Sequence, residues 1–355
     1  MANVKKKRLA AIEYIRAVSM LGVIGIHVGS QYLMNPMANV HLVALFEIVT
    51  RFSVPIFFFI SAFGLFYKLD LNVPLDYSNF IRRRFKAVLI PYLLWSFLYL
   101  IHDDWYYGVT FLDIGYIIKV LFFGLAKYQL YFLVILLWFY ALMPLWIEIV
   151  KWCTMRRLLI LLIVQTAFNY FSSYSTILTT LTYSLPADSF LHDLLSYRLN
   201  YLVLHYVFIF VLGGYLAVHK NEFFEFMKQH KLTISVSFIM SLAVLLAHYY
   251  FVIFFRHLPP EAAINTAHQL SPAGIIYTIC ACVFWFMLFM HFIKESNILQ
   301  YLGKHSFFIY LVHPLVIVYL NLAVFKLELL MTAPVAILFY LLTAAISMVL
   351  AHFFD

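Results

Sequence analysis

Charged residues are scarce in this sequence. Asp, Glu, Lys and Arg together make up only 11% of its 355 residues, whereas hydrophobic residues make up 65%. A soluble globular domain has about a quarter of its residues charged, and the mean hydropathy here is +0.92. The composition therefore excludes a soluble protein and predicts a polytopic membrane protein, with residues 1–355 forming a single integral membrane domain.

Cysteine is scarce as well. Cys153, Cys280 and Cys282 are the only three, and each lies in apolar sequence. A disulfide framework or a metal site needs paired ligands at characteristic spacings. We therefore expect no metal ion and no bound cofactor. The basic residues, although they give a net charge of +8, are spread over many loops, so we expect no nucleic-acid partner.

Long hydrophobic runs, by contrast, are abundant. Runs of about 20 residues are the signature of membrane-spanning helices. They predict ten such helices, near residues 9–31, 42–67, 86–102, 129–150, 156–173, 199–218, 232–255, 272–293, 307–325 and 333–354. The stretch 109–126 is shorter and contains Asp113, Lys119 and Lys127, which predicts a short interfacial or re-entrant helix. The predicted fold class is therefore all-α.

The distribution of cations predicts the orientation in the membrane. Of the 24 Lys and Arg residues, 17 are predicted to lie on the same side of the membrane as the N-terminus. Five are predicted on the opposite side, and two lie within spans. Loops rich in Lys and Arg remain in the cytoplasm. With an even number of spans, both termini are predicted to be cytoplasmic.

The first predicted helix contains Glu13, Arg16 and His27, although a charge inside a membrane costs about 2.5 to 3.5 kcal/mol. Glu13 and Arg16 are spaced to pair on one helix face. Arg16 and His27 share a stripe about 16 Å long, with Arg16 toward the cytoplasmic half of the membrane and His27 toward the outer half. Gly22 and Gly25 between them allow a helix or a ligand to approach. From these residues alone, His27 is either a buried structural histidine or a functional one.

The second helix contains Arg51, and Pro55 is predicted to kink it within the membrane. Such a kink opens a cavity for Arg51, Ser53 and Ser61, or serves packing alone.

Two further motifs contain groups able to bind or react. Arg82, Arg83 and Arg84 precede the third helix, where they can hold anionic phosphates or simply fix the topology. Near the end of the chain, Tyr310 and His313 lie one helical turn apart, and the run 307–325 places them in the inner half of the membrane.

These motifs together resemble the acyltransferase 3 family of bacterial membrane O-acyltransferases. The resemblance rests on four segments in the family's order: Arg16 with His27; Val54, Pro55, Phe57, Phe58 and Ser61; Arg82, Arg83 and Arg84; and Gly303, Ser306, Tyr310 and His313. The sequence departs from the family pattern at Ala62, where glycine is usual, and at Lys86, where arginine is frequent. Within the family it is most similar to the stand-alone members of intercellular-adhesion loci, which act on poly-N-acetylglucosamine and contribute to biofilm.

The resemblance implies a multi-pass protein of the bacterial plasma membrane. Acyl-CoA is then the donor substrate, with an acetyl or succinyl group, and a hydroxyl of a cell-surface polysaccharide is the acceptor. It implies His27 and Arg16 as catalytic residues and Arg82, Arg83 and Arg84 as donor-binding residues. Supporting residues are Glu13, Arg51, Ser61, Tyr310 and His313. Membrane lipid and a polysaccharide synthase complex are the other expected partners.

Two alternatives stay open: an exporter of a surface polysaccharide or lipid-linked sugar, and an inactive scaffold of a synthase complex. The sequence has no phosphate-binding Gly-x4-Gly-Lys-Ser/Thr loop, which argues against a primary pump. A proton-coupled carrier would be expected to use buried acids. The clear candidates here, Glu13 and Glu47, lie near helix ends. This scarcity of acids favours the enzyme.

Overall fold

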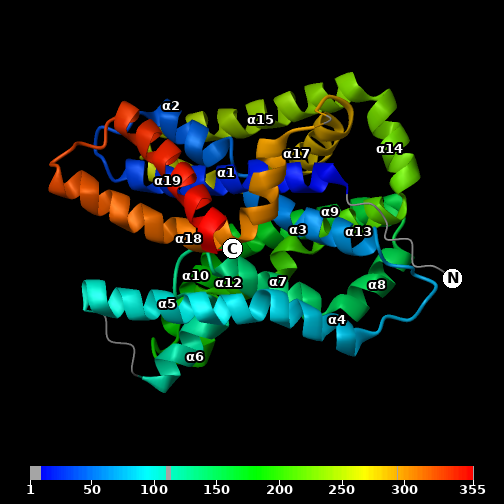
Figure 1. Ribbon diagram of the computed structural model, residues 1–355, viewed down its shortest axis with the longest axis horizontal. Helices are drawn as coiled ribbons and strands as arrows, with labels where there is room; N and C mark the ends of the chain where they lie inside the picture. Colours follow the sequence, from blue (N-terminus) through cyan, green and yellow to red (C-terminus); the bar gives the residue numbers. More distant parts are fainter. Residues whose placement is uncertain (1–8, 109–112, 294, 355) are drawn as a thin grey trace. The chain divides into compact units, whose positions relative to one another are not determined.

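The computed structural model describes residues 9–108, 113–293 and 295–354, and within these ranges every regular element is helical. The chain divides into two compact units. Unit 1 contains residues 1–69 and 212–355, and unit 2 contains residues 70–211. Figure 1 shows the helices of both units in sequence colours. The predicted all-α fold is confirmed. Residues 5–8 and 294, whose cationic side chains are predicted to be cytoplasmic, lie outside the described residues.

Unit 1 contains the first and last parts of the chain. Its elements are α1 (Ala10–Leu33), α2 (Val40–Val43), the π-helical turn η1 (Ala44–Ile48), α3 (Ser53–Phe66), α14 (Lys220–Gln229), α15 (Lys231–Phe254), α16 (Pro260–Thr266), α17 (Pro272–His291), α18 (Asn297–Lys326) and α19 (Ala333–Phe354). The boundary between the units falls within α13 (Val207–Val218).

Unit 2 contains the middle of the chain and has shorter, more broken helices. Its elements are α4 (Tyr77–Arg84), the π-helical turn η2 (Phe85–Leu89), α5 (Ile90–Tyr107), α6 (Ile114–Phe123), α7 (Tyr131–Ala141), α8 (Met143–Trp152), α9 (Met155–Tyr174), α10 (Thr176–Ser184), α11 (Phe190–Ser196), α12 (Arg198–Tyr201) and the 3-10 turn η3 (Val203–Tyr206).

The described helices include seven that are long and apolar enough to cross a membrane, or up to ten if each bent pair is one span. The bent pairs are α7 with α8 (69°), α9 with α10 (48°), and η3 and α13 with α14 (93°). The predicted ten spans therefore match the upper count, with three of them broken. The short helix predicted at 109–126 is present as α6, a helix of ten residues.

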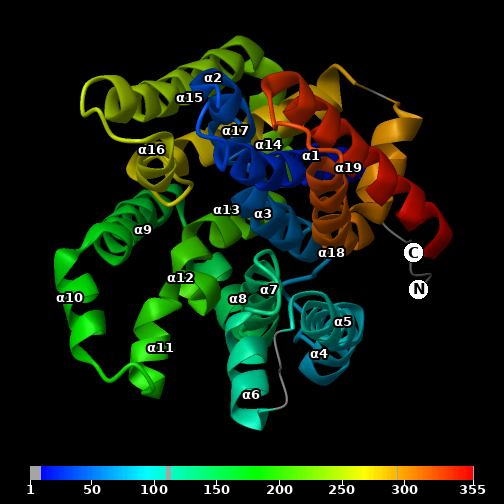
Figure 2. The same cartoon turned by 90° about the vertical axis from the view of Figure 1, so that its left-hand side faces the viewer.

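Helix α1 is the centre of unit 1. It packs most extensively against α18 and also contacts α3, α17 and α19, as the second view shows (Figure 2). Its glycines explain this close packing. A Cβ at Gly22 would overlap the side chain of Ser53, and one at Gly29 would overlap Phe46 and Glu47. The sequence allows either a helix or a ligand to approach the glycines of α1. In the structure, a neighbouring helical segment packs against them.

The contact between α1 and α18 also depends on a glycine. A Cβ at Gly303 would overlap the backbone of Glu13, so only glycine lets the two helices approach this closely. The Ser306 hydroxyl donates a 2.9 Å hydrogen bond to the Gly303 carbonyl. In the last predicted motif, Gly303 thus allows α18 to dock on α1, and Ser306 bonds within α18.

In unit 2, polar side chains of α9 satisfy a broken segment of backbone. The amide group of Gln165 donates to the Leu204 carbonyl at 2.7 Å, and its oxygen accepts from the Phe208 N–H at 3.0 Å. Asn169 donates to the His205 carbonyl at 3.2 Å. Irregular backbone at membrane depth requires such partners. These buried polar residues therefore have a structural explanation.

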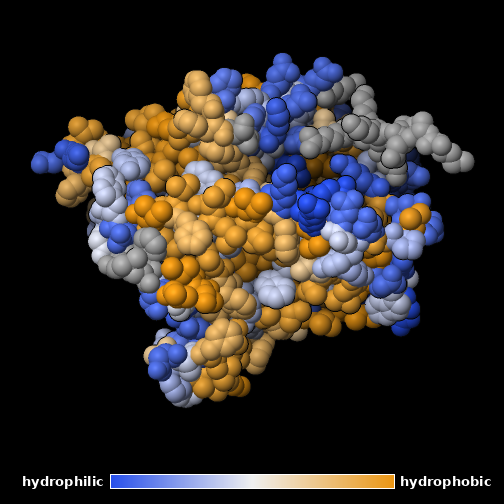
Figure 3. All heavy atoms as spheres, turned by 60° about the horizontal axis from the view of Figure 1, so that its bottom comes forward, coloured by the Kyte–Doolittle hydropathy of each residue, from blue (hydrophilic) through white to orange (hydrophobic). Residues whose placement is uncertain are grey.

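The surface agrees with a lipid environment. Leu94, Leu98 and Ile101 on α5 are each more than half exposed, as are Ile163 and Val164 on α9. Figure 3 shows a face on which hydrophobic residues, in orange, cover most of the surface. Soluble monomers rarely expose apolar patches of this extent. The chain is therefore a multi-pass membrane protein.

Candidate active site

Two histidines from distant parts of the chain meet inside unit 1. His27 lies in α1 and His313 in α18, with ring centroids 5.4 Å apart and ring planes inclined by 23°. His313 is fully buried, whereas His27 keeps part of its surface accessible. Within this histidine pair, His27 is the residue that keeps some accessible surface.

The histidine pair constrains a predicted depth. The sequence predicts His27 in the outer half of the membrane and His313 in the inner half. Rings whose centroids are 5.4 Å apart lie at nearly the same depth, so the two predictions agree with each other only where both rings are close to the membrane midplane. Helix α18 begins at Asn297, ten residues before the hydrophobic run. Hydropathy does not reveal these first turns, because they contain polar residues such as Gln300 and Lys304. His313 is consequently a mid-helix residue.

Arg51 carries its own counterion beside the histidine pair. Its guanidinium lies 3.0 Å from the Glu47 carboxylate, and Glu47 accepts a 2.8 Å hydrogen bond from the Ser30 hydroxyl. Ser30 follows His27 by three residues on α1, and His27 is within electrostatic range of Arg51. The side chain of Arg51 is only 11% exposed. The ion pair therefore holds a positive group close to the accessible histidine.

Glu47 is a residue that the sequence prediction does not include among the site residues. It is 2% exposed and faces Gly29 of α1. The signal that could have found it is its spacing of four residues from Arg51, which places both side chains on one helix face. Both residues flank an irregular stretch of chain, and π-helical turns of the kind seen at Ala44–Ile48 are frequent at functional sites.

Pro55 lies in the first turn of α3, where its ring excludes a regular helix one turn earlier. The chain there opens into turns over residues 49–52, so Arg51 stands at an irregular point of the span. Ser61 lies ten residues further along α3, about 15 Å from Arg51 by helix rise. Ser53 packs on α1 instead. At Ser53 the structure thus shows a packing role.

Arg16 lies closer to the N-terminal end of α1 than His27 does. Eleven residues separate it from His27, about 16 Å along the helix axis. Its guanidinium is 3.7 Å from the Glu13 carboxylate, and its side chain is 35% exposed. The predicted pairing of Glu13 with Arg16 is confirmed. Arg51, rather than Arg16, is the arginine beside His27.

Tyr310 extends the buried part of the site. It is 7% exposed, and its ring centroid lies 6.2 Å from that of His313. The predicted placement of Tyr310 and His313 on one helix face is therefore confirmed.

The three predicted donor-binding arginines belong to unit 2 and differ in their surroundings. Arg82 and Arg83 are exposed at the end of α4. Arg84 is partly buried, with its guanidinium 5.4 Å from the ring centroid of Phe80 and 5.5 Å from that of Tyr140. Arg84 therefore packs α4 against α7, and Arg82 and Arg83 are the two arginines available to an anionic ligand.

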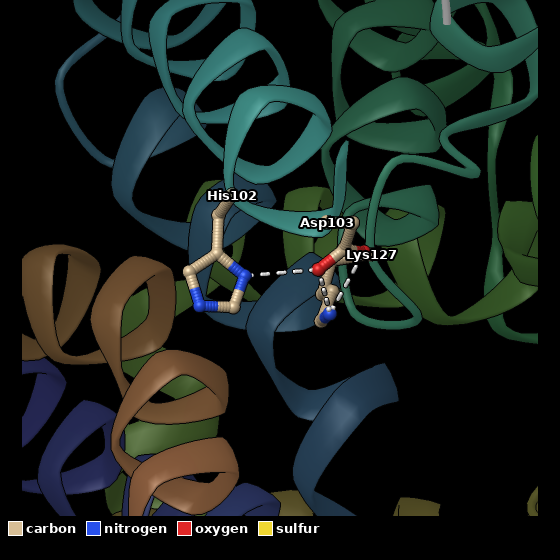
Figure 4. A network of polar contacts seen from close by, with 3 residues as sticks. All are labelled: His102, Asp103 and Lys127. Carbon is tan, nitrogen blue, oxygen red and sulfur yellow. Dashed lines mark hydrogen bonds and ion pairs between the residues drawn. The ribbon is translucent and has the colours of Figure 1, made fainter. Parts of the chain in front are cut away.

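A second polar cluster in unit 2 joins the end of α5 to the chain after α6 (Figure 4). The Lys127 ammonium lies 3.0 Å from both oxygens of Asp103, and the His102 ring lies 3.0 Å from the same carboxylate. Lys127 also stands over the ring of Tyr99 at 5.5 Å. Each of these contacts joins residues of the protein to one another, so this cluster fastens two segments together.

Helix α6 is tied down by a similar pair. Lys119 lies 2.6 Å from the Asp193 carboxylate in α11. This hydrogen bond raises the pKa of Lys119, which keeps the side chain cationic at neutral pH.

Comparisons with known proteins agree with the motifs. A family model described as an acyltransferase domain matches residues 9–352. The chain is 25% identical over 372 residues to a Staphylococcus aureus protein named "Probable poly-beta-1,6-N-acetyl-D-glucosamine export protein", covering 99% of this chain and 95% of that protein. It is also 25% identical over 316 residues to a Bacillus subtilis protein named "Putative membrane-bound acyltransferase YfiQ", covering 86% of this chain and 80% of that protein.

No solved structure gives a significant match to the chain. The family match, by contrast, spans nearly its whole length and includes both units. The chain therefore belongs to the acyltransferase 3 family of membrane proteins and is an acyltransferase.

Proposed function

We propose that this protein is a membrane O-acyltransferase of the bacterial plasma membrane. It moves an acetyl or succinyl group from cytoplasmic acyl-CoA to a hydroxyl of an extracytoplasmic polysaccharide. The observation that carries the proposal is the accessible His27 inside unit 1, with Arg51 and its counterion Glu47 on one side and His313 behind it.

The residues around His27 suit acyl transfer. A neutral imidazole can act as general base on a sugar hydroxyl or carry the acyl group itself. As the acceptor oxygen attacks the thioester, negative charge develops on the carbonyl oxygen. A fixed guanidinium stabilises such a charge, and Arg51 is the arginine beside His27. In this proposal Arg16 contacts the donor lower on α1.

The donor phosphates are assigned to exposed cations at the cytoplasmic face. Arginine binds phosphate through charge-assisted, frequently bidentate hydrogen bonds. Arg82 and Arg83 are exposed, and Lys86 follows them on the same segment. Arg84 supports this segment through its contacts with Phe80 and Tyr140.

Export of a surface polysaccharide or lipid-linked sugar is the second candidate. The name of the Staphylococcus aureus relative favours it. An exporter would need no acyl donor, so the two candidates differ in a measurable way.

The deciding experiment reconstitutes the purified protein in liposomes with acetyl-CoA or succinyl-CoA labelled in the acyl group. Oligosaccharides of β-1,6-linked N-acetylglucosamine are supplied on the opposite side of the membrane. We expect label on the oligosaccharide, dependent on His27. Movement of oligosaccharide without any label transfer would instead support export.

A further inference from the structure

His313 has a buried nitrogen that the proposed function does not use. Its Nδ1 lies 3.1 Å from the Ile309 carbonyl. A carbonyl only accepts hydrogen bonds, so Nδ1 carries the proton and Nε2 is the basic nitrogen. Nε2 is fully buried and has no hydrogen-bond partner among the described residues. A buried polar atom without a partner is costly and calls for an explanation.

The residues around Nε2 of His313 indicate that this nitrogen can accept a proton. The ring of His27 lies 5.4 Å from that of His313, centroid to centroid, with the planes only 23° apart. Imidazole nitrogens donate and accept in the plane of the ring, so the two rings can share one proton once a side-chain rotation turns a nitrogen of His27 toward Nε2 of His313. The ring centroid of Tyr310 lies 6.2 Å from that of His313, and Arg51, paired with Glu47, acts electrostatically on His27.

We infer that His313 is the proton-holding partner of His27: the proton that His27 takes from the acceptor hydroxyl passes on to Nε2 of His313. This inference rests on the proposed acyl transfer. In that reaction the acceptor oxygen forms a bond to the thioester carbonyl carbon and the carbon–sulfur bond breaks. The hydroxyl proton goes to His27, and the other ring N–H of His27 gives its proton to His313. The proton then returns through His27 to the CoA thiolate, which leaves as the thiol.

Electrostatics favours this second step. An imidazolium at His27 would lie within the electrostatic influence of Arg51, whose charge Glu47 offsets in part, and like charges repel each other in a medium of low dielectric constant. Transfer of the proton to His313 takes the positive charge off His27. The relay thus leaves Arg51 free to stabilise negative charge on the substrate.

The backbone of α18 prepares His313 to hold a positive charge. Pro314 lies inside the helix and has no N–H to donate to the Tyr310 carbonyl. That carbonyl and the one of Ile309, to which Nδ1 donates, present partial negative charge to the ring. A histidine followed directly by a proline therefore has two carbonyl oxygens as counter-charges, although it lies in the membrane.

His313→Asn is the first test variant. Asparagine can keep a side-chain N–H for the Ile309 carbonyl but has no counterpart of the basic Nε2. We expect kcat for acyl transfer to fall about a hundredfold or more, as for loss of a proton-transfer group. The KM values for acyl-CoA and acceptor should stay within about threefold, because His313 binds neither substrate. His248→Asn on α15, a partly buried histidine outside the site, is the matched control and should leave kcat unchanged.

Pro314→Ala is the second variant, chosen because it should fold at least as well as the wild-type protein. Alanine restores the N–H that pairs with the Tyr310 carbonyl and removes a helix-breaking ring. If His313 only packs against His27, a more regular helix should leave kcat the same or raise it. We expect kcat to fall severalfold although the thermal unfolding midpoint rises.

The outcomes separate this inference from the proposed function. A His313→Asn protein that transfers acyl groups with nearly wild-type kcat overturns the relay while acyl transfer itself stands. The same holds for Pro314→Ala if kcat does not fall. A wild-type protein that transfers no acyl group from any donor, by contrast, contradicts the proposed function.

Discussion

The guanidinium of Arg51 lies 3.0 Å from the carboxylate of Glu47, and both side chains are almost fully shielded from solvent. Ion pairs buried in this way are costly to break, because the remaining charge keeps no compensation. The pair therefore fixes Arg51 beside His27. Glu47 therefore accounts for the position of Arg51.

This relationship predicts the effect of Glu47→Gln. The amide keeps the shape and can still accept from Ser30, but it leaves Arg51 without a counterion. We expect acyl transfer to fall at least about tenfold and the free energy of unfolding to drop by about 1–3 kcal/mol. Acyl-transfer assays and thermal unfolding in detergent measure the two effects. Glu261→Gln, an exposed acid on α16, is the control, and an equal response of both variants would argue against a special role for Glu47.

The packing of α18 on α1 predicts a contrast between two glycines. At Gly303 an added Cβ would overlap the Glu13 backbone, whereas at Gly64 in α3 it would meet nothing within 4 Å. We expect Gly303→Ala to destabilise the protein by about 1–3 kcal/mol. Gly64→Ala should be neutral, or stabilising by up to about 1 kcal/mol, through helix propensity. Thermal unfolding of both variants under one condition tests this contrast, and a Gly303→Ala protein as stable as Gly64→Ala would contradict the close packing.

The sequence predicts the positions of the helices well. It predicts the contacts between residues of different helices less well. Each hydrophobic run of about 20 residues corresponds to a helix or to a bent pair, because lipid imposes that length. The bends themselves, such as the 69° between α7 and α8, leave hydropathy almost unchanged and so were not predictable in this way.

The site shows the same limit. Arg16 and Glu13 pair as their spacing indicates, since local geometry on one helix decides that contact. The meeting of His27 with His313 joins residues 286 positions apart, and only the packing of α18 on α1 brings it about. Depth in the membrane is likewise a property of the whole helix, and α18 begins at Asn297, before the hydrophobic run that the sequence shows.

The contrasting surroundings of the arginines in unit 2 predict two different mutant phenotypes. We expect the double variant with Arg82→Gln and Arg83→Gln to raise KM for acyl-CoA, with less salt sensitivity than the wild-type protein, because exposed phosphate contacts are screened by ions. Arg84→Gln should lower the thermal unfolding midpoint instead, because it removes contacts with Phe80 and Tyr140. Titrations of acyl-CoA at two salt concentrations distinguish these effects.

The control for this experiment is Arg156→Gln, which removes another exposed cation from a loop predicted to be cytoplasmic. Each variant also needs a topology check, since loss of inner-loop cations can invert helices. If the correctly oriented double variant kept the wild-type KM and salt response, the arginines would serve topology alone.

The cation distribution predicts the sidedness of the chain. A reporter that is active only in the cytoplasm should be active when fused after residue 355, and one active only outside should be active within 256–271, between α15 and α17. Strong external activity at residue 355 would reverse the orientation. The assignment of Arg82 and Arg83 to cytoplasmic acyl-CoA would then be wrong as well.

His27→Gln gives the strictest test of the acyltransferase site. Glutamine keeps polarity and much of the volume beside Arg51 and His313, so the fold of unit 1 should survive, with the thermal unfolding midpoint within a few degrees of wild type. It has no basic ring nitrogen and can neither accept the hydroxyl proton nor carry an acyl group. A general base contributes about 10² to 10⁴-fold to the rate, so we expect label transfer to the oligosaccharide to fall at least a hundredfold. His248→Gln on α15 controls for the loss of a histidine as such.

A His27→Gln protein that still acylates the sugar at nearly wild-type rate would show that His27 takes no part in the chemistry. Since His27 is the member of the histidine pair that keeps some accessible surface, the site in unit 1 would then have to be abandoned as the place of acyl transfer.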